Sequence, residues 1–452
     1  MSELAGRERD ITAALDVYAA AKDGSASRVL LIEGPGGSGK TTVLQALEQI
    51  VSREATVFRA GARRLDRVQP RSLIERLALP SALDELLRER PVMLAIDDAQ
   101  HADEASLDEL ARLLTTFAGR ALLVVFALEG DAANTLPFPS NTRVWLRELE
   151  PESARRIVRV HYSAAPQGVI DAIVESAAGN AYELVVLAKA AASRRAAGAE
   201  EIDYSARSAI AKQLAALAPQ QRSFLQLLSL MGDPVERELL DLAWPDSSEL
   251  NGLLDALTPA YLRRDREHVF FDHALTASAI SETIAMKIPL HRRIVAAYER
   301  RGANDLRERM ALAEQMRASG DRAGAQATLL ATALEAGVRG LRRAVLWASE
   351  RHLELGEPPE EQFIAFYQSF FAALMETGQS VRAEAIAAHA LSEGQHRKLS
   401  GLGALAAQLV QAQWTVDRRD AARASFARYA QAFDDPRDLE LLRASEPPSR
   451  DG

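Results

Sequence analysis

The chain has 452 residues, of which 48% are apolar and 26% charged, and its net charge is −9. This length exceeds a single hydrophobic core and predicts several domains, and the ordinary apolar content argues against extensive disorder. The sequence has no cysteine, which excludes disulfides, thiolate metal sites and cysteine nucleophiles, and its acidic balance argues against broad nucleic-acid affinity.

Five short apolar runs in the first part of the chain are predicted strands. They are separated by helix-length segments and comprise residues 30–32, Ala55–Phe58, Val92–Ile96, Ala121–Leu128 and Thr142–Leu146. Apolar strands that alternate with helices indicate a parallel sheet covered on both faces, so residues 1–150 are predicted to form an α/β domain. No run is long enough to cross a membrane and the N-terminal sequence lacks a signal-peptide core, so a cytoplasmic protein is expected.

The sequence GPGGSGKT at residues 34–41 lies between the first strand and a predicted helix, and it fits the G-x-x-x-x-G-K-[ST] pattern of a phosphate loop. Glycines let backbone N–H groups approach phosphate oxygens at a helix N-terminus. A glycine-rich surface turn is the alternative, but the flanking strand and helix favour nucleotide binding. The predicted nucleotide contacts here are Gly34, Pro35, Gly36, Gly37, Ser38, Gly39, Lys40, Thr41 and Thr42.

Individual roles follow from this motif and from a second one. Lys40 is expected to reach the β- and γ-phosphates, Thr41 to bind Mg²⁺ and Thr42 to approach the α-phosphate. The segment LAIDDAQ places Asp97 and Asp98 at the carboxyl end of the third strand, where ligands bind in open α/β sheets. Asp97 is predicted to hold Mg²⁺ through water, and Asp98 to orient or deprotonate the attacking water. Such a pair also occurs as a simple turn or helix cap, but its place after a phosphate loop favours the functional interpretation.

Beyond Pro151 apolar residues recur mainly at helical spacing. Residues 151–204 are predicted to form a helical lid, and residues 205–300 a small winged-helix-like domain whose hairpin spans Tyr261–Phe271. Residues 301–440 are Ala-rich and predicted to be helical throughout, and residues 441–452 are predicted to be a disordered tail.

Three turn signals punctuate this last helical part: ASGDRAGA near 318, ETGQSVRAEA near 376 and TVDRRDAARA near 415. Each precedes a helix rich in small residues, as in tetratricopeptide repeats of ~34 residues, but the separations are irregular. Degenerate tetratricopeptide-like repeats and an unrelated helical bundle both fit this pattern. The punctuation favours the repeats.

The motifs together resemble a known family. LAGRERDI, the phosphate loop, LAIDDAQHAD, LRELEPESARRIV and AAGNAYEL occur in the same order in the signal-transduction ATPases of the STAND class, which are related to AAA+ proteins. The resemblance is greatest to the ATPase part of the large LuxR-type (LAL) bacterial transcription regulators, and it covers residues 3–300 well and the remainder loosely. It implies an α/β nucleotide domain of the AAA+/STAND type, a helical lid, a winged-helix domain and helical repeats.

The resemblance also implies roles for residues outside the two motifs. Arg7, with its neighbours Gly6 and Glu8, would lie near the adenine and ribose, and Asn180 would lie in the lid near the base. His273 matches a winged-helix histidine that contacts the β-phosphate of bound ADP in related ATPases. A lone histidine in an amphipathic helix is also often a packing or capping residue.

The chain departs from the family pattern at two positions. Ala181 stands where relatives have proline, which would loosen the adenine contact. Glu129 stands where relatives commonly have arginine, and a carboxylate cannot stabilise phosphate charge as a guanidinium does. No C-terminal LuxR-type helix-turn-helix is visible. These departures weaken the case for fast turnover and for DNA binding.

The sequence therefore predicts an ATP/ADP-dependent conformational switch in bacterial regulation with slow, Mg²⁺-dependent ATP hydrolysis, because no arginine finger is evident. The expected cofactors are ATP or ADP and Mg²⁺. The expected partners are a protein or effector bound by the repeats and further copies of the chain. Two alternatives remain: a DNA-binding LuxR-type regulator or its truncated form, and a nucleotide-stabilised scaffold that binds a partner protein without turnover.

Overall fold

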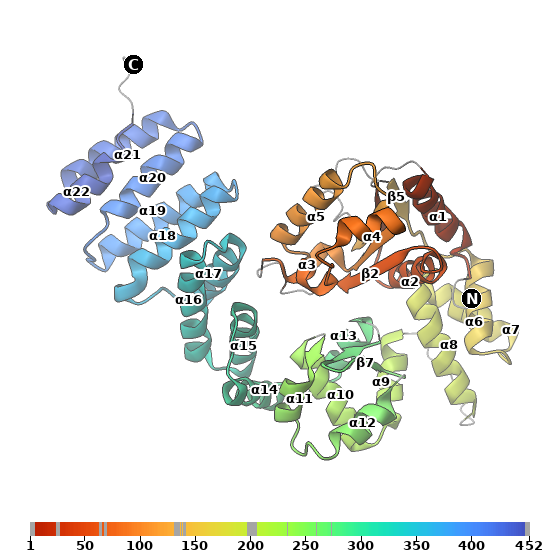
Figure 1. The fold of residues 1–452 in the computed structure, drawn as a ribbon. Coiled ribbons are helices and arrows are strands. Elements are labelled where there is room, and N and C mark those ends of the chain that lie inside the picture. Colours follow the sequence, from red (N-terminus) through yellow and green to blue (C-terminus); the bar gives the residue numbers. More distant parts are fainter. Residues whose placement is uncertain are drawn as a thin grey trace. The chain divides into compact units, whose positions relative to one another are not determined.

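The structure is a computed structural model. It describes residues 5–23, 28–62, 66, 70–130, 136, 138, 142–196, 206–232, 234–258, 260–272 and 274–447. The chain divides into two units, residues 1–290 and 291–452. The first is drawn from red to green and the second from teal to blue in Figure 1. The residues predicted to bind nucleotide all belong to the first unit.

A five-stranded parallel sheet lies at the centre of the α/β part of the first unit (Figure 1). The order of its strands is β2-β3-β4-β1-β5. Its strands are β1 Arg28–Gly34, β2 Thr56–Gly61, β3 Val92–Asp97, β4 Leu122–Glu129 and β5 Thr142–Trp145. All five predicted apolar runs form strands, so the prediction of a parallel α/β sheet is confirmed. In register, Gly34 at the end of β1 lies opposite Glu129 at the end of β4.

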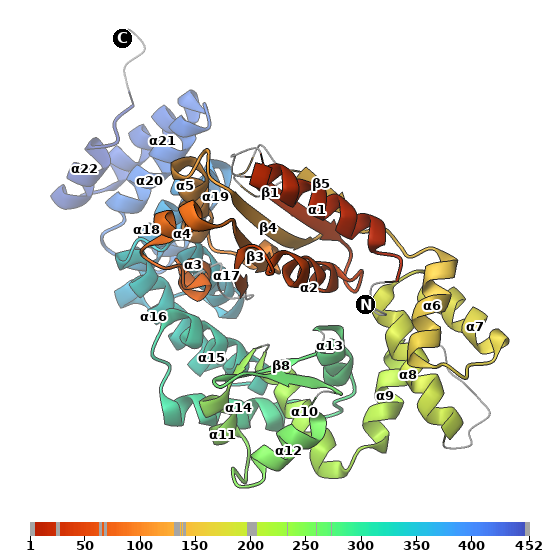
Figure 2. The same ribbon diagram turned by 45° about the vertical axis from the view of Figure 1, so that its right-hand side comes forward.

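Alternate residues of the strands enter two separate cores, which is why the runs are apolar almost without interruption. Leu30 and Ile32 of β1 belong to the core that α1 and α2 cover, whereas Val29 and Leu31 belong to the core that α3, α4 and α5 cover. Both α1 and α2 can be followed beside the strands in Figure 2. The helices are α1 Glu8–Asp23, α2 Lys40–Val51, α3 Ser72–Leu77, α4 Leu83–Glu89 and α5 Glu104–Thr116, with a short 3₁₀ helix, η3 Ala99–His101, after β3.

Three helices follow the sheet: α6 Pro151–His161, α7 Gln167–Ala177 and α8 Ala181–Ala196. The first begins with Pro151, a position where the missing N–H removes no helical hydrogen bond. Buried residues of all three share one core, among them Ile157, Ile173 and Leu187. This group occupies the range predicted for the lid, and the name lid is used below for α6, α7 and α8 with the turns that connect them.

The rest of the first unit combines helices with a small antiparallel sheet in the order β6-β8-β7. The predicted hairpin is present as β7 Leu262–Arg264 and β8 His268–Phe271. A third strand, β6 Val235–Glu236, was not predicted because two residues show no alternation. The helices are α9 Ala206–Ala216, α10 Pro219–Met231, α11 Arg237–Ala243, α12 Leu250–Leu257 and α13 Ala274–Glu282.

The second unit is built from helices that pack against their neighbours along the chain. They are α14 Ile288–Arg301, which begins just before the division, α15 Leu306–Ser319, α16 Arg322–Val338, α17 Arg342–Leu355, α18 Glu360–Glu376, α19 Ser380–His396, α20 Gly403–Thr415, α21 Arg419–Ala432 and α22 Pro436–Arg443. The last helix extends into the predicted tail, whose residues 448–452 lie outside the described residues.

The helical arrangement confirms the prediction of tetratricopeptide-like repeats and explains the irregular spacing of the turns. Alternate helices also contact each other in succession: α16 contacts α18, α18 contacts α20 and α20 contacts α22. The helical hairpins are therefore stacked side by side. The turns near 376 and 415 follow the even-numbered helices α18 and α20, whereas the turn near 318 follows the odd-numbered helix α15. The even-numbered helix α16 is also followed by a turn, at Gly340, and this turn was not predicted.

No helix within the described ranges combines the length and apolarity that crossing a membrane requires.

Candidate nucleotide-binding site

The phosphate loop connects the end of β1 to the start of α2, and two left-handed residues shape it. Gly37 has a φ of +78° and Gly39 a φ of +95°, conformations that side chains with a Cβ rarely adopt. The N–H of Ser38 donates to the carbonyl of Pro35 at 3.2 Å and closes the turn. Because α2 begins at Lys40, its unpaired N–H groups and positive dipole end face this loop. Such a loop is suited to binding phosphate.

Lys40 folds back over the loop. Its ammonium donates to the carbonyl oxygens of Gly34 at 3.0 Å and Pro35 at 2.8 Å. Partial burial lowers the pKa of Lys40. Three carboxylates oppose this shift, in decreasing order Glu129, Asp98 and Asp97. The ammonium is therefore placed beside the loop and within the field of carboxylates at three positions. Thr42 lies two residues further on in α2 and is half-buried.

The predicted magnesium ligands come from two elements that meet. Thr41, in the first turn of α2, donates its hydroxyl to Oδ1 of Asp97 at the end of β3, at 3.3 Å. Both are oxygen donors of the kind that Mg²⁺ prefers, and proteins usually bind this ion through one or two carboxylates together with phosphate oxygens. In the described part of the chain no group of three His, Asp or Glu side chains could hold a metal ion. The residues present therefore fit Mg²⁺ only as a joint ligand of protein and nucleotide.

Asp98 has a φ of +52°, which is uncommon for a residue other than glycine and often marks a functional position. Its side chain reaches solvent on one side, yet the surrounding protein removes enough water to raise the pKa of Asp98, and the charge of Asp97 adds to this effect. A solvent-accessible carboxyl with a raised pKa has the properties of a group that orients or deprotonates water.

Gln100 is the last residue of the LAIDDAQ segment, and no role in the site was predicted for it. Its Nε2 donates to Oδ1 of Asp98 at 3.2 Å, and its Oε1 accepts from the backbone N–H of Glu129 at 3.2 Å. One side chain thus ties the carboxyl end of β3 to that of β4. A lone glutamine carries no spacing signal, so only its place next to the two aspartates could have indicated it.

Arg7 supports the phosphate loop from outside. Only 6% of Arg7 is exposed, and its Nη2 donates to the carbonyl oxygens of Ser38 at 2.9 Å and Arg147 at 2.8 Å. Nη1 lies 3.3 Å from the carboxylate of Asp10. Burial lowers the pKa of Arg7, and Asp10 opposes the shift. These bonds fix the loop relative to α1, and contact with adenine stays a prediction.

Asn180 brings the lid to the phosphate loop. Its Nδ2 donates to the carbonyl of Gly36 at 3.0 Å. Its Oδ1 accepts from the N–H groups of Tyr182 at 3.1 Å and Glu183 at 3.2 Å, which caps the N-terminus of α8. The N–H of Tyr182 also lies 3.0 Å from the carbonyl of Gly37. The lid thus contacts the loop itself, while the predicted contact of Asn180 with the base stays a prediction.

Tyr182 connects the lid to α13 through a hydrogen bond. Its hydroxyl and that of Thr276 are 2.6 Å apart, and Thr276 is only 9% exposed. Burial raises the pKa of Tyr182 to about 12, so the hydroxyl is protonated at neutral pH. Tyr182 was not among the predicted residues. His273, predicted to contact the β-phosphate, lies outside the described residues.

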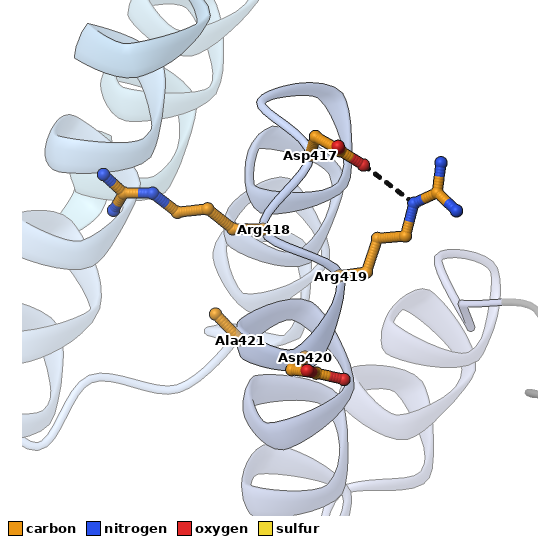
Figure 3. Close-up of a pocket in the computed structure, with 5 residues that line it drawn as sticks. All are labelled: Asp417, Arg418, Arg419, Asp420 and Ala421. Atoms are coloured by element: carbon orange, nitrogen blue, oxygen red, sulfur yellow. Dashed lines mark ion pairs between the residues drawn. The ribbon is translucent and has the colours of Figure 1, made fainter.

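A shallow hollow in the second unit is not part of this site. It has a volume of about 410 Å³ and lies at the start of α21 in the second unit (Figure 3). Its lining residues are Asp417, Arg418, Arg419, Asp420 and Ala421. Figure 3 shows Asp417 and Arg419 pointing toward each other, 2.8 Å apart, and Arg418 pointing away. The four charged side chains are exposed, and they are already paired: Asp417 with Arg419, Arg418 with Glu384 and Asp420 with Arg423.

Comparisons with known proteins agree with a nucleotide-binding first domain. Residues 3–87, which include the phosphate loop, match the AAA ATPase domain family. No curated protein matches the chain. A P-loop ATPase fold implies nucleotide binding.

Three similar solved structures illustrate the range of likeness. A STAND protein with a tetratricopeptide repeat sensor from Pyrococcus horikoshii is 15% identical, with a TM-score of 0.44 over 97% of this chain and 72% of that chain. Cdc6p from Pyrobaculum aerophilum is 14% identical, with a TM-score of 0.37 over 62% of this chain and 94% of that chain. A RuvB variant from Thermotoga maritima is 15% identical, with a TM-score of 0.32 over 60% of this chain and 94% of that chain.

Proposed function

We propose that the chain is a signal-transduction ATPase of the STAND class that acts as an ATP/ADP-dependent conformational switch and hydrolyses ATP slowly with Mg²⁺. The observation that carries the proposal is the hydrogen bonding between lid and phosphate loop. Asn180 and Tyr182 donate to the carbonyls of two consecutive loop residues, Gly36 and Gly37. A phosphate that changes the loop therefore changes the lid contacts as well.

Nucleotide binding follows from the loop and its cation. Backbone N–H groups and Lys40 bind the phosphates, and Thr41 and Asp97 hold Mg²⁺ together with phosphate oxygens. Asp98 orients the attacking water, and Gln100 holds the Asp98 carboxylate at 3.2 Å. Hydrolysis is slow in this proposal because Glu129, at the end of β4, offers negative charge where a cation would stabilise the transferring phosphoryl group.

The switch itself requires that the nucleotide change the equilibrium between two arrangements of the lid. Tyr182 contributes both to the loop contact and, through its hydroxyl, to the contact with Thr276 on α13. A nucleotide that favours one loop conformation then favours one lid and α13 arrangement. The proposed contact of His273 with the β-phosphate would add to the same coupling.

The test compares wild type with Lys40→Ala and Lys22→Ala. Lys22 is an exposed lysine on α1, 2.6 Å from Glu54, and so controls for the loss of a lysine charge. In Lys40→Ala, steady-state ATPase activity and ADP affinity are expected to fall at least about tenfold, because charge-assisted bonds to phosphate are lost, and the rise in melting temperature with ADP is expected to become smaller. All three are expected to persist in Lys22→Ala. Equal rates in all three proteins would remove Lys40 from the mechanism.

A second candidate is a nucleotide-stabilised scaffold that binds a protein partner through the repeats. The carboxylate of Glu129 beside the phosphate loop favours it, because such a site would hold nucleotide without hydrolysing it quickly. Tightly bound ADP after purification, no measurable hydrolysis and a stable partner would support the scaffold. Multiple turnovers that Lys40→Ala abolishes would support the switch.

The finer assignment to large LuxR-type regulators of the bacterial cytoplasm belongs to the same proposal and rests on the order of the motifs. DNA binding is the weaker part of it. In the hairpin, Arg263 and Arg264 are already paired with Asp272 and Asp255, which reduces the charge available to phosphates. A gel-shift series from low to high salt tests this part, and absence of binding at low salt would exclude it.

A further inference from the structure

Glu129 has its carboxylate beside the phosphate loop. The backbone sets its position, because Glu129 pairs with Gly34 in the parallel register and Gly130 donates to the carbonyl of Gly34 at 3.2 Å. The side chain of Gln100 adds a third restraint by accepting from the N–H of Glu129. A Cβ added to Gly36 would lie 3.1 Å from Oε1 of Glu129. The carboxylate therefore faces the loop backbone.

The carboxylate also acts on the cation that would hold the terminal phosphates. Among the charged groups that act on Lys40, Glu129 has the largest effect, ahead of Asp98 and Asp97. In a phosphate loop this lysine contacts the β- and γ-phosphates. A phosphate bound by Lys40 is therefore also in the electrostatic field of Glu129, and each further ionised phosphate is repelled more strongly.

The balance of charge at this end of the sheet makes the repulsion matter. The carboxylates of Asp97, Asp98 and Glu129 lie at the ends of β3 and β4, and Arg59, 3.5 Å from Asp97, offsets part of their charge. ATP carries one more ionised phosphate than ADP, and Mg²⁺ neutralises charge on both nucleotides. The carboxylate should then discriminate most between the two nucleotides when Mg²⁺ is removed.

We propose that Glu129 is a specificity-determining residue that makes the binding of a nucleoside triphosphate, more than that of a diphosphate, depend on Mg²⁺. This inference rests on the proposed nucleotide-binding function. In addition to slowing hydrolysis, Glu129 at the end of β4 would distinguish a triphosphate from a diphosphate. The result is a site that retains the diphosphate whenever free Mg²⁺ is scarce.

The experiment measures dissociation constants of ATP and ADP by titration calorimetry, in EDTA and in excess Mg²⁺. Wild type is compared with Glu129→Gln, which keeps the size of the side chain, with Glu129→Ala, and with Glu152→Gln as control. Glu152 is an exposed residue of α6 that lies 3.8 Å from Arg155. In EDTA, both Glu129 variants are expected to bind ATP about tenfold more tightly than wild type, and ADP only about two- to threefold more tightly. In Mg²⁺ the two ratios should converge.

Raising the salt concentration gives an independent readout. Because the proposed effect is electrostatic, the ATP deficit of wild type in EDTA should shrink with ionic strength, while the Glu129 variants should change less. Circular dichroism melts establish that every protein is folded.

Two different failures are distinguishable. If ATP and ADP bind but the Glu129 variants change both equally, or no more than Glu152→Gln does, the inference is overturned and nucleotide binding stands. If folded wild type and all variants bind neither nucleotide in either condition, the proposed function fails, and the inference fails with it.

Discussion

The phosphate-loop region of the first unit and the helical core of the second differ in what holds their residues in place. Around the loop, Asp98 has a positive φ, which is uncommon for a residue with a Cβ, and Lys40 is a partly buried cation. In the second unit, Phe363 and Phe366 of α18 are fully buried in an apolar core. Residues of the first kind tend to cost stability and those of the second kind supply it. Binding and stability should therefore respond to different substitutions.

The largest expected effect comes from the aromatic core. Phe366→Ala removes a ring whose centroid lies 5.0 Å from that of His352 and 5.2 Å from that of Tyr367. The substitution should lower the free energy of unfolding of the repeat unit by about 3–5 kcal/mol, because it leaves a cavity. Urea unfolding followed by circular dichroism measures the loss, and titration calorimetry with ADP should show unchanged affinity.

Val338→Ala is the matched control, because Val338 is 90% exposed at the end of α16. It should change stability by less than about 0.5 kcal/mol. If Phe366→Ala weakens ADP binding as strongly as it destabilises the protein, the separation of the two regions is wrong and the units are energetically coupled.

Features formed by contiguous residues could be predicted from the sequence, whereas contacts between distant residues could not. The five strands, the phosphate loop and the Asp97–Asp98 pair were predicted because each depends on contiguous residues with a fixed period or spacing. The contact of Tyr182 with Thr276 joins residues 94 positions apart and leaves no local signal. Gln100 is likewise defined by what it bridges. The repeats were predicted as a class, but Gly340 is followed by Leu341 and not by a polar residue as in the turns near 318 and 376, so this turn was missed and the period was obscured.

Asn180 allows the two kinds of contribution to be separated at one residue. Asn180→Ala removes both the cap of α8 and the donor to Gly36, so it should cost about 1 kcal/mol of stability and also weaken ADP binding. Asn180→Asp keeps the cap acceptor, removes the donor and adds negative charge beside the loop. It should preserve the melting temperature and weaken ADP binding more than alanine does.

Thermal melts and ADP titrations of both Asn180 variants measure the two effects. Wild-type affinity in Asn180→Asp would show that the amide takes no part in the nucleotide site and that its role is confined to capping.

A smaller effect is expected at the contact between lid and α13. Tyr182→Phe keeps the ring and removes the hydroxyl that meets Thr276, so it should cost about 1 kcal/mol. Hydrogen exchange of the α13 amides should become faster, while the exchange of α1 should not change. Thr276→Val and the double variant complete a mutant cycle. Additive effects of the two substitutions would show that the hydroxyl contact contributes no coupling.

The smallest expected effect has the opposite sign. The folded-state pKa of Asp98 is raised, so the native state binds this proton more tightly than the unfolded state, and the contribution of Asp98 to stability is present at low pH and lost as pH rises through the folded pKa. At neutral pH the ionised group therefore destabilises the protein, and Asp98→Asn should raise the melting temperature by about a degree. The gain should disappear as the pH falls toward ~4, where free carboxyls protonate. Asp16→Asn, at an exposed position of α1, controls for the loss of a carboxylate. If the gain in melting temperature is equal at both pH values, or if Asp16→Asn reproduces it, Asp98 does not lower the stability of the folded protein. The contrast between the loop region and the aromatic core would then not extend to Asp98.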